Sequence, residues 1–542
     1  MSLPAGGTAT PAPTQPPKST PQSTPATRPR APFTAAAVTA AVAAVALSWD
    51  RPGIGWPLTA LVLIAAVLAA VHVERRGTLS GGVVSGGVVP GGVVPGGTRS
   101  GGVEAGGVEA GGVEVGRVQP GRAVVRIGWA VAAWMLLAVG AVRAAGWLFV
   151  LCVLTAGLAG CLALTDRRSV GGVLLAPLRV AGAMPAALRW LVRGGIRVRG
   201  RDRNTLVRTL VAGLIAMALL LVFGFLLAWG DAAFAHAVST MVSSLDGGTV
   251  LRGIWSAAVA VAVTAVAAYL LLTRASVPEK ESRAGLVRRI EWALTVGGLV
   301  VLFAGFVTVQ ARVLFGGRAY VEATTGLTYA QYARGGFWQL LAVTMLTVIV
   351  ISVVARIAPR SAVADRVLLR ALLGLLSALA LVIVASALSR MAAYEQAYGF
   401  TRQRLLVTAC ELWLGTVFLL ILIAGIRLRG RWVPEIALAT AVAALLGLAV
   451  LNPDAFIARQ HIARFAETGR IDVDYLRTLS PDAVPALQSL PEPYRSCALA
   501  AIDIQLAESR PEAWLEWNLG RNTAKAQLHH HPPAPYFSFC PL

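Results

Sequence analysis

The sequence predicts an all-α fold: a polytopic transmembrane helical bundle of about 11 spans with a small helical extracytoplasmic C-terminal cap. Of its 542 residues, 56% are hydrophobic and only 14% are charged, where a soluble chain has about 25% charged residues. The mean hydropathy is +0.67. Apolar runs of 17 or more residues recur along the chain, and each is long enough to cross a bilayer as a helix. A soluble enzyme, a nucleic-acid-binding domain and a disulfide scaffold are therefore disfavoured.

The N-terminal part of the chain has a polar leader followed by two apolar runs. Residues 1–32 are rich in Pro, Thr and Ser, lack apolar content and are predicted to be disordered. Residues 33–73 hold the first two predicted spans. Because Arg28 and Arg30 precede the first of them, 33–49, a cleaved secretory signal is the alternative interpretation of that run.

A linker and an arginine-rich segment flank the next hairpin. Residues 74–122 are predicted to be a flexible cytoplasmic linker, since they repeat a Gly-Gly-Val pentapeptide that cannot hold a helix or strand. Residues 123–204 are predicted to form a helical hairpin and an amphipathic inner-leaflet segment. The partners predicted for that segment are anionic inner-leaflet lipids rather than nucleic acid, bound through Arg179, Arg189, Arg193, Arg197 and Arg199.

Residues 205–451 are predicted to form the main transmembrane bundle. Over the whole chain the predicted spans are 33–49, 57–73, 124–142, 144–164, 206–229, 250–273, 292–311, 337–356, 367–389, 405–426 and 434–451.

Basic residues indicate the direction of these spans. The N-terminal segment, alternate loops and the adjoining span ends hold 31 of the 48 Lys and Arg residues, and the intervening loops hold nine. Because basic residues gather on the cytoplasmic side, the distribution predicts a bacterial cytoplasmic-membrane protein with a cytoplasmic N-terminus and an extracytoplasmic C-terminus.

The C-terminal region has helix caps and periodic apolar positions. Residues 452–526 are predicted to be a helical cap on the outer membrane face, with Asp454 capping a helix to about Ala466, and 527–542 a flexible tail. In that position Cys497 and Cys540 could form a disulfide. The tail histidines His529, His530 and His531 lack acidic or Cys partners nearby, so no metal site is predicted.

Polar residues concentrate in two predicted outer loops and one span. Six arginines lie in these loops, where Glu322 and Glu395 are the nearest acidic residues in sequence. In the span 405–426, Glu411 shares a helix face with Arg404, Thr408 and Gly415, because their spacings are four, three and four. A carboxylate facing lipid costs roughly 2.5–3.5 kcal/mol, so this face should point into the bundle. It could hold a proton or a substrate, or a structural hydrogen bond. The predicted substrate-binding residues are Glu322, Arg334, Tyr394, Glu395, Tyr398, Arg402, Arg404 and Glu411.

Four motifs resemble an uncharacterised bacterial family of multi-pass membrane proteins. They are Thr324–Phe337, Tyr394–Arg404, Asn452–Arg459 and Trp514–Arg521. The chain resembles the family of domain of unknown function 4173, which is related to 4153, over about residues 205–525. The resemblance implies a helical membrane protein and no established reaction or ligand. Phe400 stands where the family pattern has Leu, and His461 where it has Asn.

The sequence contains none of the common nucleotide-binding, metalloprotease or serine-nucleophile motifs. We therefore expect a non-enzymatic protein without a cofactor, either a transporter or an outward-facing sensor or assembly module. A membrane-embedded enzyme acting on a lipid-linked substrate at the outer leaflet, with Glu322 or Glu395 as acid or base, is the alternative.

Overall fold

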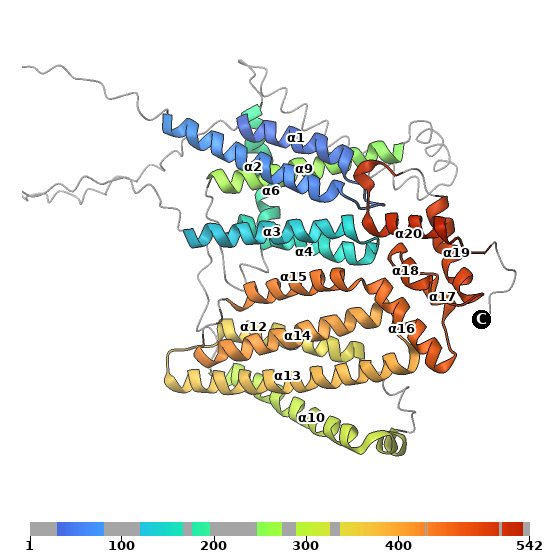
Figure 1. Ribbon diagram of the computed structural model, residues 1–542. Helices are drawn as coiled ribbons and strands as arrows, with labels where there is room; N and C mark the ends of the chain where they lie inside the picture. The colour runs from blue at the N-terminus through green and yellow to red at the C-terminus, as the bar shows by residue number, and fades with distance from the viewer. Residues whose placement is uncertain are drawn as a thin grey trace, which may run out of the picture.

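In the computed structural model, long helices lie roughly alongside one another, with shorter C-terminal helices gathered at one end (Figure 1). The structure describes residues 30–80, 120–165, 176–195, 247–273, 289–325, 337–428, 430, 432–508 and 512–534. Within these ranges no strand occurs. The long helices are α1 (Arg30–Ala46), α2 (Gly55–Ser80), α3 (Pro120–Val142), α4 (Gly146–Leu164), α6 (Ala176–Gly195), α9 (Gly247–Thr273), α10 (Arg289–Thr325), α12 (Phe337–Ile357), α13 (Val363–Tyr398), α14 (Arg402–Arg427) and α15 (Val433–Leu451).

Nine of the described helices are long and apolar enough to cross a membrane: α2, α3, α4, α9, α10, α12, α13, α14 and α15. These helices make this a multi-pass membrane protein. Each corresponds to one predicted span. The first predicted span is the 17-residue helix α1, which is shorter than these nine. The predicted span 206–229, the leader and the Gly-Gly-Val linker lie outside the described residues.

The described spans pack in three groups. Helices α1, α2 and α9 pack together, and α6 crosses α1 and α9 and buries Ala187 and Leu191 against Ala36 and Val266 (Figure 1). Helices α10, α12, α13 and α14 share a second apolar core that includes Val296, Leu376 and Phe418. The third group is α3, α4 and α15.

The third group shares its apolar core with the C-terminal helices. These are α16 (Pro453–Thr468), α17 (Val473–Leu476), η1 (Pro481–Ala483), α18 (Val484–Leu487), α19 (Tyr494–Ala507), η2 (Trp514–Glu516) and α20 (Leu519–His530), and we call residues 452–534 the end layer. Leu136 of α3 and Leu148 of α4 belong to one cluster with Ile457, Leu487 and Leu499 of the end layer. The end layer is therefore packed against the spans through a shared apolar core, and not joined to them by the chain alone.

Several predicted boundaries are wrong. The outer loop expected from Gln310 continues as helix α10 to Thr325, and the loop expected over 390–404 is only the three residues between α13 and α14. Asn452, not Asp454, caps α16, because its side chain accepts from the Ala455 amide, and the helix continues to Thr468. The tail predicted to be flexible from residue 527 stays helical to His530. An apolar run ends where the hydrocarbon ends, whereas a helix ends only at a cap or a turn residue.

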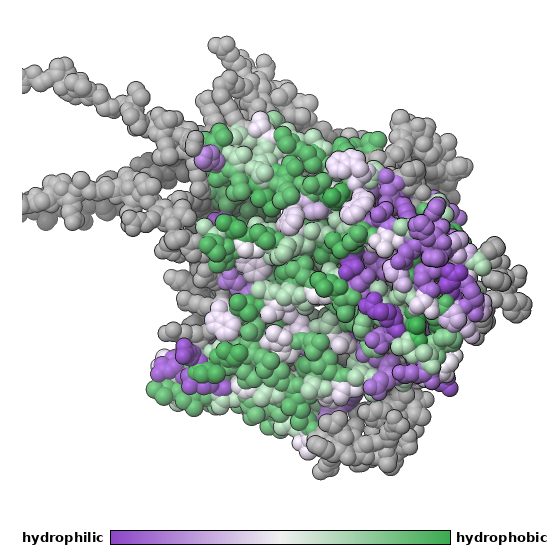
Figure 2. All heavy atoms as spheres, viewed as in Figure 1, coloured by the Kyte–Doolittle hydropathy of each residue, from purple (hydrophilic) through white to green (hydrophobic). Residues whose placement is uncertain are grey.

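The connections contacted by the end layer are those predicted to lie outside. Asp482 binds the α3–α4 connection, Arg402 of the α13–α14 hairpin binds Asp454, and α15 runs directly into α16. The α1–α2 connection lies so close that a Cβ on Gly53 would meet the Glu516 backbone at 2.4 Å. In the space-filling view the end layer is mainly hydrophilic and the long helices are mainly hydrophobic (Figure 2). These four connections therefore lie at the same end of the molecule.

Candidate functional site

Most of the predicted site residues lie at or near the turn between α13 and α14. Gly399 ends α13 with a φ of +80°, a conformation that L side chains rarely adopt. Thr401 then caps α14, its side chain accepting from the Arg404 amide at 3.4 Å. This tight turn places Arg402 and Arg404 in the first helical turn of α14, at the surface where the spans meet the end layer.

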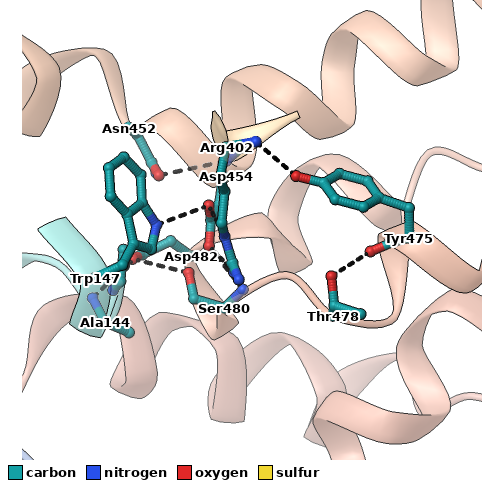
Figure 3. A network of polar contacts seen from close by, with 11 residues as sticks. Ala144, Trp147, Arg402, Asn452, Asp454, Tyr475, Thr478, Ser480 and Asp482 are labelled. Carbon is teal, nitrogen blue, oxygen red and sulfur yellow. Dashed lines mark hydrogen bonds and ion pairs between the residues drawn. The ribbon is translucent and has the colours of Figure 1, made fainter. Parts of the chain in front are cut away.

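Arg402 and Asp454 form a bidentate ion pair across this boundary (Figure 3). Arg402 Nε lies 2.9 Å from Asp454 Oδ1, and Nη2 lies 2.5 Å from Oδ2. Trp147 Nε1 of α4 donates to Oδ1 at 3.4 Å, and the Ser480 amide donates to Oδ2 at 2.8 Å. Burial raises the pKa of Asp454, but the Arg402 bonds and charge and the Ser480 bonds outweigh it, so the pKa lies below its ordinary value. The carboxylate thus stays ionised although it has no exposed surface.

The backbone of the turn is held by the end layer as well. His461 Nε2 lies 2.8 Å from the Phe400 carbonyl oxygen, so this nitrogen carries the hydrogen and donates it. The Arg402 amide donates to the Tyr475 hydroxyl at 2.7 Å, and the Tyr475 ring stacks on His461. Burial lowers the pKa of His461, which favours the neutral imidazole. The two positions that depart from the resembled family pattern, Phe400 and His461, are therefore bonded to each other.

Asp482 fixes the α3–α4 connection in the same network. Its Oδ2 accepts from the Ala144 and Ala145 amides at 2.7 and 2.9 Å, and from Ser480 Oγ at 3.3 Å. Its Oδ1 is buried without a hydrogen-bond partner among the described residues. Burial raises the pKa of Asp482 to about 6, more than the Arg143 charge and the two amides lower it.

A second polar set follows the seam where α13 and α14 pack. Arg404 lies over the Tyr394 ring at 4.1 Å and donates to the Gly399 carbonyl, and the Tyr394 and Tyr398 rings meet edge to face at 5.0 Å. One step deeper, Thr408 Oγ1 donates to Glu395 Oε1 at 3.4 Å. The seam is therefore polar from the end layer inward for two helical turns.

Glu411 lies at the inner end of this seam. Its side chain is 1% exposed, and neither carboxylate oxygen has a hydrogen-bond partner in the described part of the chain. Below it the seam is apolar, since a Cβ on Gly415 would lie 3.4 Å from Val384. An ionised carboxylate there would lack compensation, so this arrangement suits the neutral acid.

Six of the eight predicted site residues lie in this region: Tyr394, Glu395, Tyr398, Arg402, Arg404 and Glu411. They do not share one pocket, because Arg402 points to the end layer and Glu411 lies within the span. Glu322 is in α10, but its side chain is not described, and Arg334 lies outside the described residues. The described residues contain no group of three or more His, Cys, Asp or Glu that could hold a metal ion.

Sequence reasoning missed the acidic partner of Arg402. Glu322 and Glu395 are the nearest acids in sequence to the outer arginines, whereas Asp454 is 52 positions from Arg402. Both residues stand in the quoted motifs, so a search for opposite charges between motifs could have paired them. Asp482 and Tyr475 carry no comparable local pattern.

Residues 130–490 match the family described as a domain of unknown function (DUF4153). The match covers two thirds of the chain, and the chain belongs to this family. The match is to this family and not to the related family 4173, and the matched region begins earlier than residue 205. It includes α3 from Ala130 onward and all of α4. No curated protein and no solved structure matches the chain. The Arg402 network and Glu411 both lie within the matched region.

Proposed function

We propose that this chain is a non-enzymatic, transporter-like protein of the bacterial cytoplasmic membrane, with Glu411 as its proton-binding group. The observation that carries the proposal is the burial of this carboxyl group in α14 without a hydrogen-bond partner among the described residues. Ionisable residues inside membranes are costly and commonly functional. To release its proton, Glu411 must gain water or a polar partner, so proton release requires the packing around it to change.

The seam between α13 and α14 is the proposed route to this group. Glu395 and Thr408 lie between the end layer and Glu411, and Glu411 is about 10 Å deeper than Arg404 at 1.5 Å per residue. Gly415 lies one helical turn beyond Glu411 and packs against Val384. Transport of a proton past Glu411 would therefore require this packing to open as well.

We place the end layer on the extracytoplasmic side. The basic residues predict this direction, and Cys497 supports it because it is disulfide-bonded. Structural disulfides persist in oxidising compartments. The expected partner, Cys540, lies outside the described residues, while Cys152, Cys161 and Cys410 are free thiols. Helix α6, which carries Arg179, Arg189 and Arg193, then lies on the inner side, where we propose that it binds anionic lipids, together with Arg197 and Arg199.

A sensor or assembly role and an enzymatic role are the alternative proposals. A sensor or assembly role would use the bonds that join the α13–α14 turn to the end layer, since a shift of α14 would pass to that layer. The enzyme alternative requires Glu322 or Glu395 as acid or base; Glu395 is buried and bonded to Thr408. Arg402, one of the arginines considered for an anionic ligand, is occupied by Asp454.

Labelling with dicyclohexylcarbodiimide tests the proton site. This apolar reagent adds to protonated carboxyl groups in apolar surroundings, and mass spectrometry locates the stable acylurea. We expect labelling of Glu411 that falls as the pH rises and disappears in Glu411→Gln. The matched control is Glu435→Gln, which removes an acid of α15 that contacts Trp129 and should leave Glu411 labelling unchanged. Absence of labelling at acid pH would contradict the proposal.

A flux measurement separates transport from sensing. Wild-type protein in liposomes loaded with a pH-sensitive dye should dissipate an imposed proton gradient faster than Glu411→Gln, and Glu435→Gln should match wild type. Labelling of Glu411 without any proton flux would favour a proton sensor over a transporter.

A further inference from the structure

The segment from Trp514 to Leu519 has inverted polarity. Trp514 is 71% exposed, Trp517 41% and Leu519 45%, whereas Glu516 and Asn518 between them are buried. A segment that faces water normally exposes its charged and amide side chains and buries its tryptophans. Here the side of this segment away from the protein is the apolar one.

Specific bonds fix this orientation. Ser48 Oγ donates to Glu516 Oε1 at 2.6 Å, in the connection between α1 and α2. Asn518 Nδ2 donates to the carbonyls of Gly140 and Arg143 at 2.8 and 2.9 Å, at the end of α3. Rotating the tryptophans inward would break these buried bonds, each costing about 1–3 kcal/mol when a group is left unsatisfied.

Arg521 secures the same segment from behind. Its Nε lies 2.9 Å from Glu512 Oε1, and both terminal nitrogens lie 3.3 Å from the Pro52 carbonyl oxygen. The buried guanidinium therefore ties the start of α20 to the α1–α2 connection, so the exposed tryptophans belong to a rigid surface.

The tryptophans lie at the level where the spans end. The Ile54 amide donates to the Trp517 carbonyl at 3.0 Å, directly before α2 begins. In the same connection Trp49 donates from Nε1 to Ser256 Oγ at 3.0 Å, within the first turns of α9. Trp514 and Trp517 are thus beside a span terminus and not at the far side of the end layer.

An apolar surface continues from this level onto the spans. Trp49 is itself partly exposed, and on α9 the exposed side chains of the first turns are Val250, Leu251, Ile254 and Trp255. These residues belong to a candidate membrane span, and exposed apolar side chains of a span face lipid. The exposed tryptophans of the end layer therefore extend a lipid-facing surface past the end of the helices.

We infer that Trp514, Trp517 and Leu519 form an apolar surface that inserts into the lipid headgroup region beside α1, α2 and α9. Tryptophan prefers this region because its ring is apolar and its N–H can bond to water or headgroups. The partner is the phospholipid of the leaflet on the end-layer side. The inserted surface holds this edge of the end layer on the membrane, independently of any role of Glu411.

Site-specific photocrosslinking of the full chain tests the inference. The photoreactive residue benzoylphenylalanine replaces Trp514 or Trp517, and the protein is irradiated in vesicles of phosphatidylethanolamine and phosphatidylglycerol. We expect intact-mass adducts of one phospholipid at both positions, several-fold above those at Ser489, an exposed control position of the end layer. Because Trp514 is mostly exposed and Trp517 bonds through its backbone, neither replacement should disturb folding.

Two results would overturn the inference. Phospholipid adducts at 514 and 517 no more abundant than at Ser489 would mean that the surface faces water. A crosslinked species of twice the chain mass in place of the lipid adduct would mean that a second copy covers it.

Discussion

Arg402 and Asp454 join a transmembrane helix to the end layer through two hydrogen bonds, and Asp454 is fully buried in the contact. Its other bonds come from Trp147 and Ser480, so one carboxylate connects α4, α14 and two parts of the end layer. The contact therefore determines how the α13–α14 turn sits against the rest of the molecule.

Removing one partner of this pair should be costly. We expect Asp454→Asn to lower the free energy of unfolding by about 3 kcal/mol, because it leaves the Arg402 charge half-buried and uncompensated. Thermal unfolding in detergent measures the effect. Asp474→Asn, which breaks the exposed pair with Arg477, should change it by less than about 0.5 kcal/mol. Equal effects of the two substitutions would show that the buried pair contributes no more to the free energy of unfolding than the exposed pair does.

Asp482 should make stability depend on pH. Its folded pKa of about 6 lies above the ordinary value of about 3.9. Its contribution to stability is therefore fully present below about pH 3.9 and is lost as the pH rises through about 6, by up to about 2–3 kcal/mol. Subtracting the Asp482→Asn unfolding curve from that of wild type isolates this loss. A flat difference between about pH 4 and 7 would contradict it.

His461 acts in the opposite direction over a neighbouring range. Because its folded pKa is lowered, its contribution is present above about pH 6.5 and is lost as the pH falls through the folded value. We expect His461→Gln, which keeps an N–H donor toward Phe400, to be less sensitive to acid than wild type. Greater acid sensitivity of the variant in the same unfolding measurement would show that the imidazole is stabilising when charged.

The turn at Gly399 should not accept a side chain. A Cβ would lie 3.0 Å from His461 Cε1 and 3.1 Å from Arg464 Nη1, at a positive φ. We expect Gly399→Ala to destabilise the protein by about 1–3 kcal/mol. Gly157 of α4 has open space around its position, so Gly157→Ala should be neutral or stabilising in the same thermal measurement.

Cysteine accessibility tests the compartment of the end layer. Alkylation of protein denatured without reductant should modify Cys152, Cys161 and Cys410 and spare Cys497 and Cys540. Reductant should expose both, and a Cys497–Cys540 peptide should appear only in the unreduced digest. Modification of all five thiols without reductant, in protein isolated from its native membrane, would place the end layer in a reducing compartment.

Much of the helical arrangement can be predicted from the sequence, because a segment that crosses lipid must be a helix with a long run of apolar residues. Such a run is easily recognised in a sequence. Nine predicted spans coincide with described helices, and the face of Arg404, Thr408, Glu411 and Gly415 follows from helical spacing alone. The ends of helices were less predictable. The sequence predicts a polar loop that includes Tyr394, Glu395 and Tyr398. In the structure these residues belong to α13, which ends at Gly399.

The contacts between the spans and the end layer could not be predicted in the same way. Asp454 was expected to cap its own helix, but Asn452 does so and leaves the Asp454 carboxylate for Arg402. Nor does the sequence indicate that Trp514 and Trp517 are exposed while Glu516 and Asn518 beside them are buried. Long-range pairing depends on which surfaces meet, and local composition does not encode it.

The unequal lengths of the spans have a consequence for the surrounding bilayer. Helix α13 has 36 residues, about 54 Å, while α4 and α15 have 19 residues each, about 28 Å. A hydrocarbon layer of about 30 Å matches the short helices, so α13 must tilt or project into the aqueous phase at one end or both. The difference between helix length and hydrocarbon thickness is therefore larger at α13 than at α4 and α15. A change in membrane thickness would change the tilt of α13 and with it the angle between α13 and its neighbour α14.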